Sequence, residues 1–270
     1  MKIGVAGLGL IGGSAALALR ARHEVTGYDT DERARAAAKS DGLRTVSRVE
    51  DLLPADAVIV ATSLSAVVPT LEQIAGQSDG AVLLDTGSLK RPVVEYASRA
   101  PVSARIVGGH PMAGSTSSGF SAADAGLFRD RPFLLVPTER SDDHAMGIAG
   151  TIARDLGAIV TVCSADVHDS AMARLVAAPL ATAAALAVAG AGAAPLLSAA
   201  GPGFRDSTRL AATPTDLAVE LLLGNRKNTH VALGAVIEAL EQLRNALDLE
   251  DRDYVRSFLI AARSVRDVLG

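Results

Sequence analysis

The stretch KIGVAGLGLIGGSAALAL, Lys2–Leu19, decides the fold of the first half of this chain. Apolar residues before Gly7 predict a buried strand, and small and apolar residues after Gly12 predict a helix. Gly7, Gly9 and Gly12 form the pattern GxGxxG, which marks a dinucleotide-binding turn when it follows a strand and opens a helix. The stretch therefore predicts an α/β domain of the Rossmann type.

Each glycine of the pattern has a physical task. Gly7 permits the tight turn, Gly9 lets the backbone approach a pyrophosphate, and Gly12 lets helix and strand pack closely. The helix that follows offers the free N–H groups of its first turn, at Leu10 and Ile11, to the phosphates. We expect these five residues to bind a dinucleotide.

An acid at the end of the second strand tests this expectation. Asp29 ends the predicted strand Glu24–Asp29 and lies 22 residues after Gly7, close to the usual spacing of about 20. Its carboxylate would accept hydrogen bonds from the ribose hydroxyls of NAD and repel the 2′-phosphate of NADP. Alternatively, it only caps the helix that follows. Arg33 and Arg35 keep NADP as a less favoured cofactor.

Strands and helices continue to alternate as far as Cys163. This order predicts a parallel sheet with both faces covered by helices. The further predicted strands are Asp56–Thr62, Gly80–Ser88, Ala104–His110, Arg131–Thr138 and Gly157–Cys163. The helices between them are Asp31–Gly42, Ser65–Ala75, Lys90–Ala100 and Asp142–Leu156.

After Cys163 the pattern predicts helices only. They span Ala165–Ala189, Ala193–Ala200, Thr215–Leu247 and Asp251–Val268. We therefore expect a dinucleotide-binding domain over residues 1–163 and an all-helical domain over residues 164–270.

The composition excludes several classes of protein. The net charge is −4, Trp is absent, and basic residues are scattered, so no nucleic-acid partner is expected. One cysteine, Cys163, and no basic leader fit a cytoplasmic protein. The run Leu175–Phe204 has no charge, but Pro179, Pro195 and Pro202 interrupt it. It predicts a helix pair buried in a core or an interface rather than a membrane span, and its apolar surface predicts a homodimer.

Polar residues stand at the ends of three neighbouring strands: Thr62 and Ser63, Asp85–Ser88, and Gly108–His110. In open α/β sheets the chemistry lies beyond these carboxyl ends. With an ordinary pKa of about 6.5, His110 suits the removal of a proton from an alcohol. Ser88 either orients this imidazole, contacts the substrate or caps the next helix. No metal is expected, and the other histidines are interpreted as structural or solvated: His23, His144, His168 and His230.

Four motifs resemble the prephenate/arogenate dehydrogenase family. They are GLGLIGGS at Gly7–Ser14, DTGSLK at Asp85–Lys90, GGHPMAGS at Gly108–Ser115 and GFRDSTRLA at Gly203–Ala211. The resemblance implies a nucleotide-binding domain followed by an all-helical dimerisation domain. It implies NAD-dependent oxidative decarboxylation of prephenate or arogenate, two cyclohexadienyl acids, in tyrosine biosynthesis.

The resemblance also implies residue roles. His110 matches the catalytic histidine, which accepts the C4 hydroxyl proton while hydride leaves C4 for the nicotinamide and the ring carboxylate leaves as CO2. Ser88 matches a serine that hydrogen-bonds this histidine and the substrate. Arg209 matches an arginine that binds a substrate carboxylate, and Arg205 is a second candidate. The alternative for either arginine is a surface ion pair with Asp206 or Asp216.

The sequence departs from the family at two places. Many members carry HLPH where this chain has Ala177–Leu180, and many carry Glu where this chain has Thr116. Thr116 and the adjacent Ser115 are expected to line the substrate pocket. The identity of the substrate therefore stays open among prephenate, arogenate and a modified ring such as 4-amino-4-deoxyprephenate.

Two other functions stay open at this point. A β-hydroxyacid-type dehydrogenase would use a lysine of the helical domain, for which Lys227 is the candidate. A dinucleotide sensor without activity would explain the loss of HLPH.

Overall fold

A computed structural model of the chain describes residues 1–115 and 117–268. It divides into two compact units. The first comprises Met1–Met172 together with Ala212–Asn225, and the second comprises Ala173–Ala211 and the chain from Arg226 onward. The first unit thus includes two helices that follow residue 163 in the sequence.

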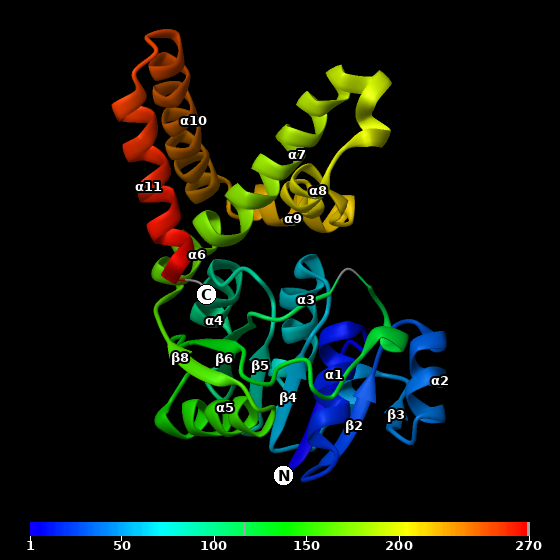
Figure 1. The fold of residues 1–270 in the computed structure, drawn as a ribbon. Helices are drawn as coiled ribbons and strands as arrows, with labels where there is room; N and C mark the ends of the chain where they lie inside the picture. The colour runs from blue at the N-terminus through cyan, green and yellow to red at the C-terminus, as the bar shows by residue number, and fades with distance from the viewer. Residues whose placement is uncertain (116, 269–270) are drawn as a thin grey trace. The chain divides into compact units, whose positions relative to one another are not determined.

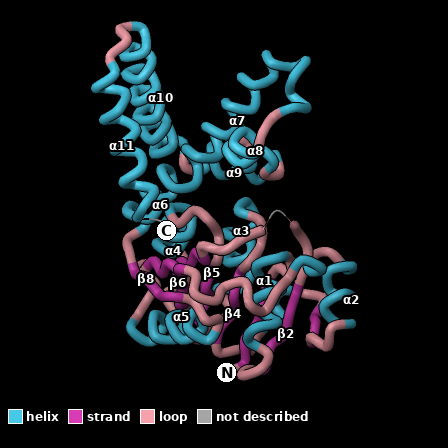
Figure 2. The backbone as a smooth tube through the Cα atoms, in the orientation of Figure 1, coloured by secondary structure: helices cyan, strands magenta, loops and turns pink. Residues whose placement is uncertain are grey.

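The first unit is built on a sheet that has eight strands in the described part of the chain (Figures 1 and 2). Their order is β3-β2-β1-β4-β5-β6-β7-β8. The strands are β1 Lys2–Ala6, β2 Glu24–Tyr28, β3 Arg44–Val46, β4 Ala57–Val60, β5 Val82–Asp85, β6 Arg105–Pro111, β7 Pro132–Val136 and β8 Ile159–Val162. This topology confirms the predicted Rossmann-type domain, with the order reversing between β1 and β4.

One strand pair differs from the predicted all-parallel sheet. β6 and β7 are antiparallel, with His110 paired to Leu134, whereas the other neighbours are parallel. The connection between β6 and β7 holds a short 3₁₀ turn, Phe120–Ala122, and no crossover helix among the described residues. A parallel pair needs such a crossover, so the prediction was wrong at this pair. The short strand β3 was also not predicted.

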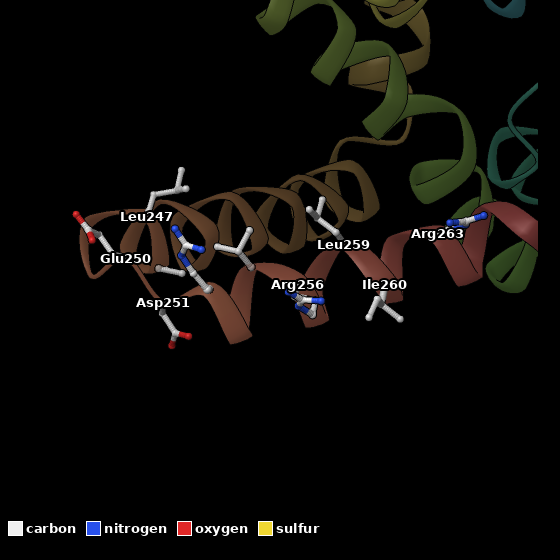
Figure 3. Close-up of a pocket in the computed structure, with 10 residues that line it drawn as sticks. Leu247, Glu250, Asp251, Arg256, Leu259, Ile260 and Arg263 are labelled. Carbon is white, nitrogen blue, oxygen red and sulfur yellow. The ribbon is translucent and has the colours of Figure 1, made fainter.

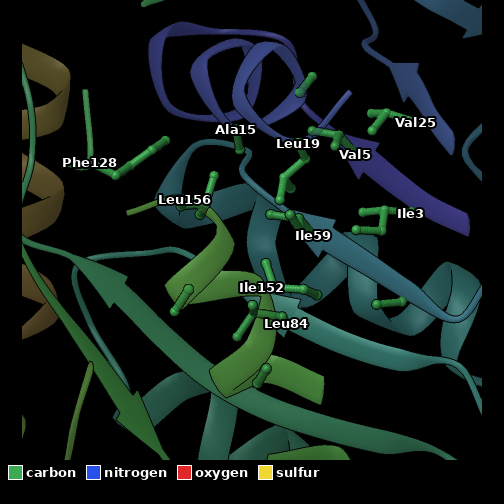
Figure 4. Packing of buried hydrophobic residues seen from close by; sticks show 14 of the residues in the cluster. Ile3, Val5, Ala15, Leu19, Val25, Ile59, Leu84, Phe128, Ile152 and Leu156 are labelled. Atoms are coloured by element: carbon green, nitrogen blue, oxygen red, sulfur yellow. The ribbon is translucent and has the colours of Figure 1, made fainter. Parts of the chain in front are cut away.

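Helices cover both faces of the sheet. Those of the first unit are α1 Leu10–Leu19, α2 Glu32–Ser40, α3 Leu64–Ala75, α4 Arg91–Arg99, α5 Asp143–Asp155, α6 Ala165–Met172 and α9 Thr215–Gly224. Ile3, Val5 and Ile59 pack with residues of α1 and α5 on one face (Figure 4). Alternate residues such as Val58 and Val60 pack with α3 and α4 on the other. The strands are apolar on both faces because both are buried.

The second unit is helical, as predicted. It contains a π-helical turn Ala173–Ala177, α7 Ala178–Gly190, a 3₁₀ segment Ala191–Ala199, α8 Pro202–Ser207, α10 Arg226–Asp248 and α11 Arg252–Val268, and a 3₁₀ turn Arg209–Ala212 leads back to the first unit. The predicted helix Thr215–Leu247 is broken at Asn225, whose backbone is not helical. The Asn225 side chain instead donates to the carbonyl of Asp169 at 2.7 Å, the kind of competing bond that ends helices.

In the described part of the chain, most of the uncharged run is not buried in a core. Large apolar side chains of the second unit are exposed, among them Leu186, Val188, Leu196 and Leu240. The helical run Ala165–Ala194 would be long enough to cross a membrane; its most apolar 18-residue window has mean hydropathy 1.8, and 22% of that window is buried. The prediction that this run is buried in a core is therefore wrong, and burial in an interface stays a prediction.

Candidate active site

The turn after β1 has the geometry that the GxGxxG pattern requires. Gly7 has φ +96°, and a Cβ there would collide with the backbone carbonyl of Ala61, just after β4. A Cβ at Gly12 would overlap the carbonyl oxygen of Gly7. A Cβ at Gly9 would meet no atom within 4 Å. Gly7 and Gly12 are therefore needed for packing, whereas Gly9 leaves open space at the turn.

The first turn of α1 fits an anionic ligand. Gly9 precedes the helix, no side chain caps it, and the first turn contains no acidic residue. The N–H groups of the first turn, at Leu10 and Ile11, have no partner within the helix. Open space beside Gly9 and free donors at a positive helix end fit the pyrophosphate of a dinucleotide.

Asp29 is held beside this turn. Its Oδ2 accepts a hydrogen bond from the Leu8 N–H at 2.7 Å, and its Oδ1 accepts one from the Asp31 N–H at 2.8 Å. The capping role that was the alternative for Asp29 is filled by Asp31, which accepts from the Arg33 N–H at 2.8 Å. Arg35 donates to the Asp29 carbonyl at 2.7 Å. The carboxylate of Asp29 is thus oriented beside the glycine turn, and its role as the ribose ligand stays a prediction.

Thr62 and Ser63 follow β4 directly. Because a Cβ on Gly7 would also meet the Thr62 nitrogen, at 3.1 Å, this strand end lies against the glycine turn. Ser63 precedes α3 and does not cap it with its side chain. Their predicted cofactor role agrees with this location and stays a prediction.

A buried ion pair lies at the ends of β5 and β6. The Nζ of Lys90 donates to Asp85 Oδ2 and, at 2.5 Å, to the carbonyl oxygen of Gly109, and both charged side chains are fully buried. The other carboxylate oxygen accepts from the Gly109 N–H at 3.1 Å. Burial raises the pKa of Asp85 and lowers that of Lys90, although their attraction opposes both shifts.

This pair explains the glycine before the histidine. A Cβ at Gly109 would collide with the carbonyl oxygen of Asp85. A Cβ at Gly108 would lie 3.2 Å from the Lys90 side chain. The sequence interpretation gave these glycines the task of admitting a ligand, whereas in the structure Gly109 packs against the Asp85 backbone and Gly108 against Val136 and Lys90.

His110 is buried in β6, with 7% of its surface exposed. Its Nδ1 lies 2.9 Å from Nε2 of His168, and the two rings meet edge to face. His168 Nδ1 in turn lies 2.7 Å from Oδ1 of Asp169. The pKa of His110 is lowered to about 3, above all by burial and then by the positive charge of Lys90 and the neighbouring His168, while Asp169 opposes them.

His168 was predicted to be structural or solvated. It is 1% exposed and contacts the candidate base, so the solvated alternative is wrong. The sequence signal that could have identified it is the adjacent pair His168-Asp169 in the polar start of a helix that follows the last sheet strand.

Ser88 is half-buried between β5 and α4. Within residues 1–115 and 117–268 it forms no hydrogen bond with His110, whose Nδ1 contacts His168 instead. Its alternative role as a helix cap is taken by Asp169, which accepts from the N–H groups of Lys90 and Arg91, each at 3.0 Å. A contact between Ser88 and substrate stays a prediction.

The remaining predicted substrate residues are divided between the two units. Ser115 is exposed and accepts from the Ser117 N–H at 3.2 Å. Thr116 lies outside the described residues. Arg205 and Arg209 are exposed residues of the second unit. In the described part of the chain neither pairs with Asp206 or Asp216, the surface alternative considered for them.

Known proteins resemble this chain along nearly its whole length. A family model described as prephenate dehydrogenase, nucleotide-binding domain, matches residues 15–162, and one described as prephenate dehydrogenase, dimerization domain, matches residues 164–260. A prephenate dehydrogenase of Bacillus subtilis (strain 168) is 33% identical over 279 residues, which cover 98% of this chain and 75% of the relative.

Two further proteins carry related names. A cyclohexadienyl dehydrogenase of Zymomonas mobilis is 29% identical over 94% of this chain and 90% of its own length. The crystal structure of Synechocystis arogenate dehydrogenase matches with a TM-score of 0.88 at 28% identity, over 100% of both chains. The resemblance predicted from the four motifs is confirmed, and the chain belongs to the prephenate dehydrogenase family.

Proposed function

We propose that this protein catalyses the oxidative decarboxylation of prephenate, arogenate or a close analogue such as 4-amino-4-deoxyprephenate. The observation that carries the proposal is the buried imidazole of His110, on the sheet whose β1 carries the dinucleotide turn and whose β2 is followed by Asp29. A buried, neutral imidazole suits the removal of one proton from an alcohol. A β-hydroxyacid-type reaction has less support, since its candidate lysine, Lys227, is exposed.

In the proposed reaction, the glycine turn and His110 of the first unit have separate roles. Bound at the glycine turn, a nicotinamide dinucleotide supplies the hydride acceptor. His110 accepts the C4 hydroxyl proton through Nε2 as C4 loses its hydride. Departure of CO2 leaves the electron pair of the broken C–C bond in the ring, which becomes aromatic, and the proton ends on the phenol oxygen.

Replacing His110 with Asn tests the role of the base. We expect kcat to fall by about 10²–10⁴, as when a general base is removed. Cofactor affinity, measured by calorimetry, should change little because the glycine turn is untouched. His144→Asn is the matched control, since His144 is exposed on α5. Near-normal turnover by His110→Asn would refute the assignment of the base.

For the cofactor we propose NAD rather than NADP. Two backbone N–H groups orient the Asp29 carboxylate, which would repel a 2′-phosphate. Arg35, the residue best placed to oppose this preference, donates to the carbonyl groups of Asp29 and Thr30. Asp29→Ser should lower the ratio of kcat/KM for NAD over NADP, and an unchanged ratio would exclude Asp29 as the ribose ligand.

For the far end of the substrate we propose recognition without the two histidines of HLPH. Ala177 and Leu180, which replace them, are buried and apolar. Arg209 then has the task of binding a carboxylate, with Arg205 as the second candidate. A panel of prephenate, arogenate and 4-amino-4-deoxyprephenate, compared by kcat/KM, tests the proposal. Turnover of none of them would refute the proposed function, and an unchanged KM in Arg209→Gln would exclude Arg209 as a ligand.

The second unit is proposed to form a homodimer. α10 and α11 enclose a groove of about 860 Å³ whose lining mixes apolar residues such as Leu247, Leu259 and Ile260 with Arg256 and Arg263 (Figure 3). Large exposed apolar patches are rare on soluble monomers and typical of interfaces, and the matching family model is described as a dimerization domain. Sedimentation should give a dimer, and a stable monomer at micromolar concentration would contradict the proposal.

A further inference from the structure

Asp169, His168 and His110 form a continuous chain of hydrogen bonds in the first unit. Asp169 Oδ1 lies 2.7 Å from His168 Nδ1, and His168 Nε2 lies 2.9 Å from His110 Nδ1. All three side chains are buried. We propose that this chain is a proton relay, in which His168 and Asp169 position His110 and receive its second proton. The inference rests on the proposed role of His110 as the base.

The direction of each hydrogen bond follows from Asp169. Burial acts to raise its pKa, but the hydrogen bonds from His168 and from the N–H groups of Lys90 and Arg91 prevail and lower it. An ionised carboxylate only accepts hydrogen bonds, so His168 Nδ1 carries a proton and donates it. A neutral imidazole has one N–H group, so His168 Nε2 accepts from the Nδ1–H of His110.

This direction leaves Nε2 of His110 unprotonated. That nitrogen is the one with no hydrogen bond to protein among the described residues, and it holds the lone pair that a base needs. If His168 carried its proton on Nε2 instead, His110 would be forced into the opposite tautomer, with its proton on the reacting nitrogen. The carboxylate of Asp169 therefore selects the tautomer of an imidazole two hydrogen bonds away.

The relay also avoids a positive charge on the buried ring of His110. An imidazolium there would be buried and would face the positive charge of Lys90. When Nε2 gains the substrate proton, the Nδ1–H bond of His110 breaks and an N–H bond forms at Nε2 of His168. The positive charge then lies on His168, whose other nitrogen is 2.7 Å from the Asp169 carboxylate. No electrons are transferred, and the same movements in reverse return the proton.

Asp169 is held rigidly enough for this task. Its two oxygens accept from the N–H groups of Lys90 and Arg91 at the start of α4, each at 3.0 Å. The positive end of a helix dipole favours an anion at this place. Asn225 donates to the backbone carbonyl of Asp169 at 2.7 Å. The carboxylate is thus attached to the start of α4, and the backbone of the same residue is attached to the end of α9.

His168→Gln tests the relay by activity. A glutamine carbonyl can accept from the His110 Nδ1–H but cannot take a proton, so kcat should fall by at least about tenfold. His168→Phe, which removes both functions, should approach the loss of about 10²–10⁴ seen without a general base. His144→Gln, at an exposed histidine of α5, is the control and should not change kcat. Cofactor binding and thermal unfolding of each variant establish that the fold is kept.

The pH profile separates a relay from a merely structural contact. The charged groups that act on His110 are Lys90, His168 and Asp169. Removing the second proton acceptor lowers the apparent pKa of the base, so the acid limb of kcat/KM should move to lower pH in His168→Gln. If His168 had only a structural role, His168→Gln would lower the plateau of kcat/KM and leave the pH of the acid limb unchanged. Unchanged kcat and an unchanged limb in His168→Gln would overturn the relay, whereas an active His110→Asn would overturn the base itself.

A second measurement needs no turnover. Nitrogen-15 NMR of histidine-labelled protein, with five histidines to assign, reports which ring nitrogen of His110 carries the proton. The relay predicts the Nδ1–H tautomer in the wild-type chain and its loss in Asp169→Asn, because an amide nitrogen can donate to His168. The analogous exchange in serine hydrolases lowers kcat about 10⁴-fold through the wrong tautomer. A proton on Nε2 of wild-type His110 would overturn the proposal whatever the substrate is.

Discussion

The substitution Lys90→Met tests how much the buried ion pair of Asp85 and Lys90 contributes to stability. The substitution keeps much of the side-chain volume but removes the ammonium group that contacts Asp85 and the Gly109 carbonyl. Both charged side chains are fully buried, so no water replaces the lost partner. Removing one member of such a pair costs about 3–5 kcal/mol, because the other charge stays buried.

The pH dependence of this loss can be worked out from Asp85. Without Lys90 its carboxyl group takes up a proton in the folded state, so its folded pKa lies above the unfolded value of about 3.9. Such a group favours the folded state at low pH and loses that contribution as the pH rises. Keeping it protonated costs about 4 kcal/mol at pH 7 and about 1.5 kcal/mol at pH 5. The variant should therefore be much closer to wild type at pH 5.

Urea unfolding followed by circular dichroism at both pH values measures this difference. Lys39→Met, at an exposed residue of α2, is the matched control and should change the free energy of unfolding by less than about 0.5 kcal/mol. Adding Asp85→Asn to Lys90→Met should recover stability at pH 7 and remove the pH dependence. An equal loss at pH 5 and pH 7 in the single variant would refute the reasoning.

Three further outcomes follow from the glycines and Asp169. Gly109→Ala should prevent soluble expression, since its Cβ would collide with the Asp85 carbonyl, whereas Gly114→Ala, where the Cβ meets nothing within 4 Å, should express normally. Gly9→Ala should keep the thermal midpoint but abolish its rise on addition of NAD, because its Cβ fills space that is open in the protein; an unchanged rise would exclude pyrophosphate there. Asp169→Ala should lower the thermal midpoint more than Asp166→Ala, because only Asp169 accepts from the N–H groups at the start of α4; equal midpoints would contradict this capping role.

The cofactor side of the first unit was predictable from local signals. The glycine turn and Asp29 both involve backbone groups: the Leu8 N–H donates to Asp29, and the glycine turn packs against the backbone after β4. The direction of β7 was not predictable, since strand residues such as Phe133 are apolar in either direction. The break at Asn225 was missed because the helical pattern continues on both sides, while the side chain makes its bond to Asp169, 56 residues earlier.

The environment of His110 was predictable only in part. A strand end and neighbouring glycines indicated the imidazole, but its partners come from distant parts of the sequence. His168 lies 58 residues later, and the only local signal for its role is the adjacent Asp169. Lys90 was recognised as part of a motif, yet nothing local indicates its complete burial beside Gly108, where a Cβ would lie 3.2 Å from the Lys90 side chain. Long-range polar pairs of this kind leave no periodicity to detect.

The groups proposed for proton transfer all belong to the first unit. His110, His168, Asp169 and Lys90 contact one another through side chains and backbone that lie within Met1–Met172. The positions that replace HLPH, Ala177–Leu180, belong to the second unit. Substitution there alters no hydrogen bond of the relay. The departure from HLPH therefore leaves the proposed chemistry of the ring intact.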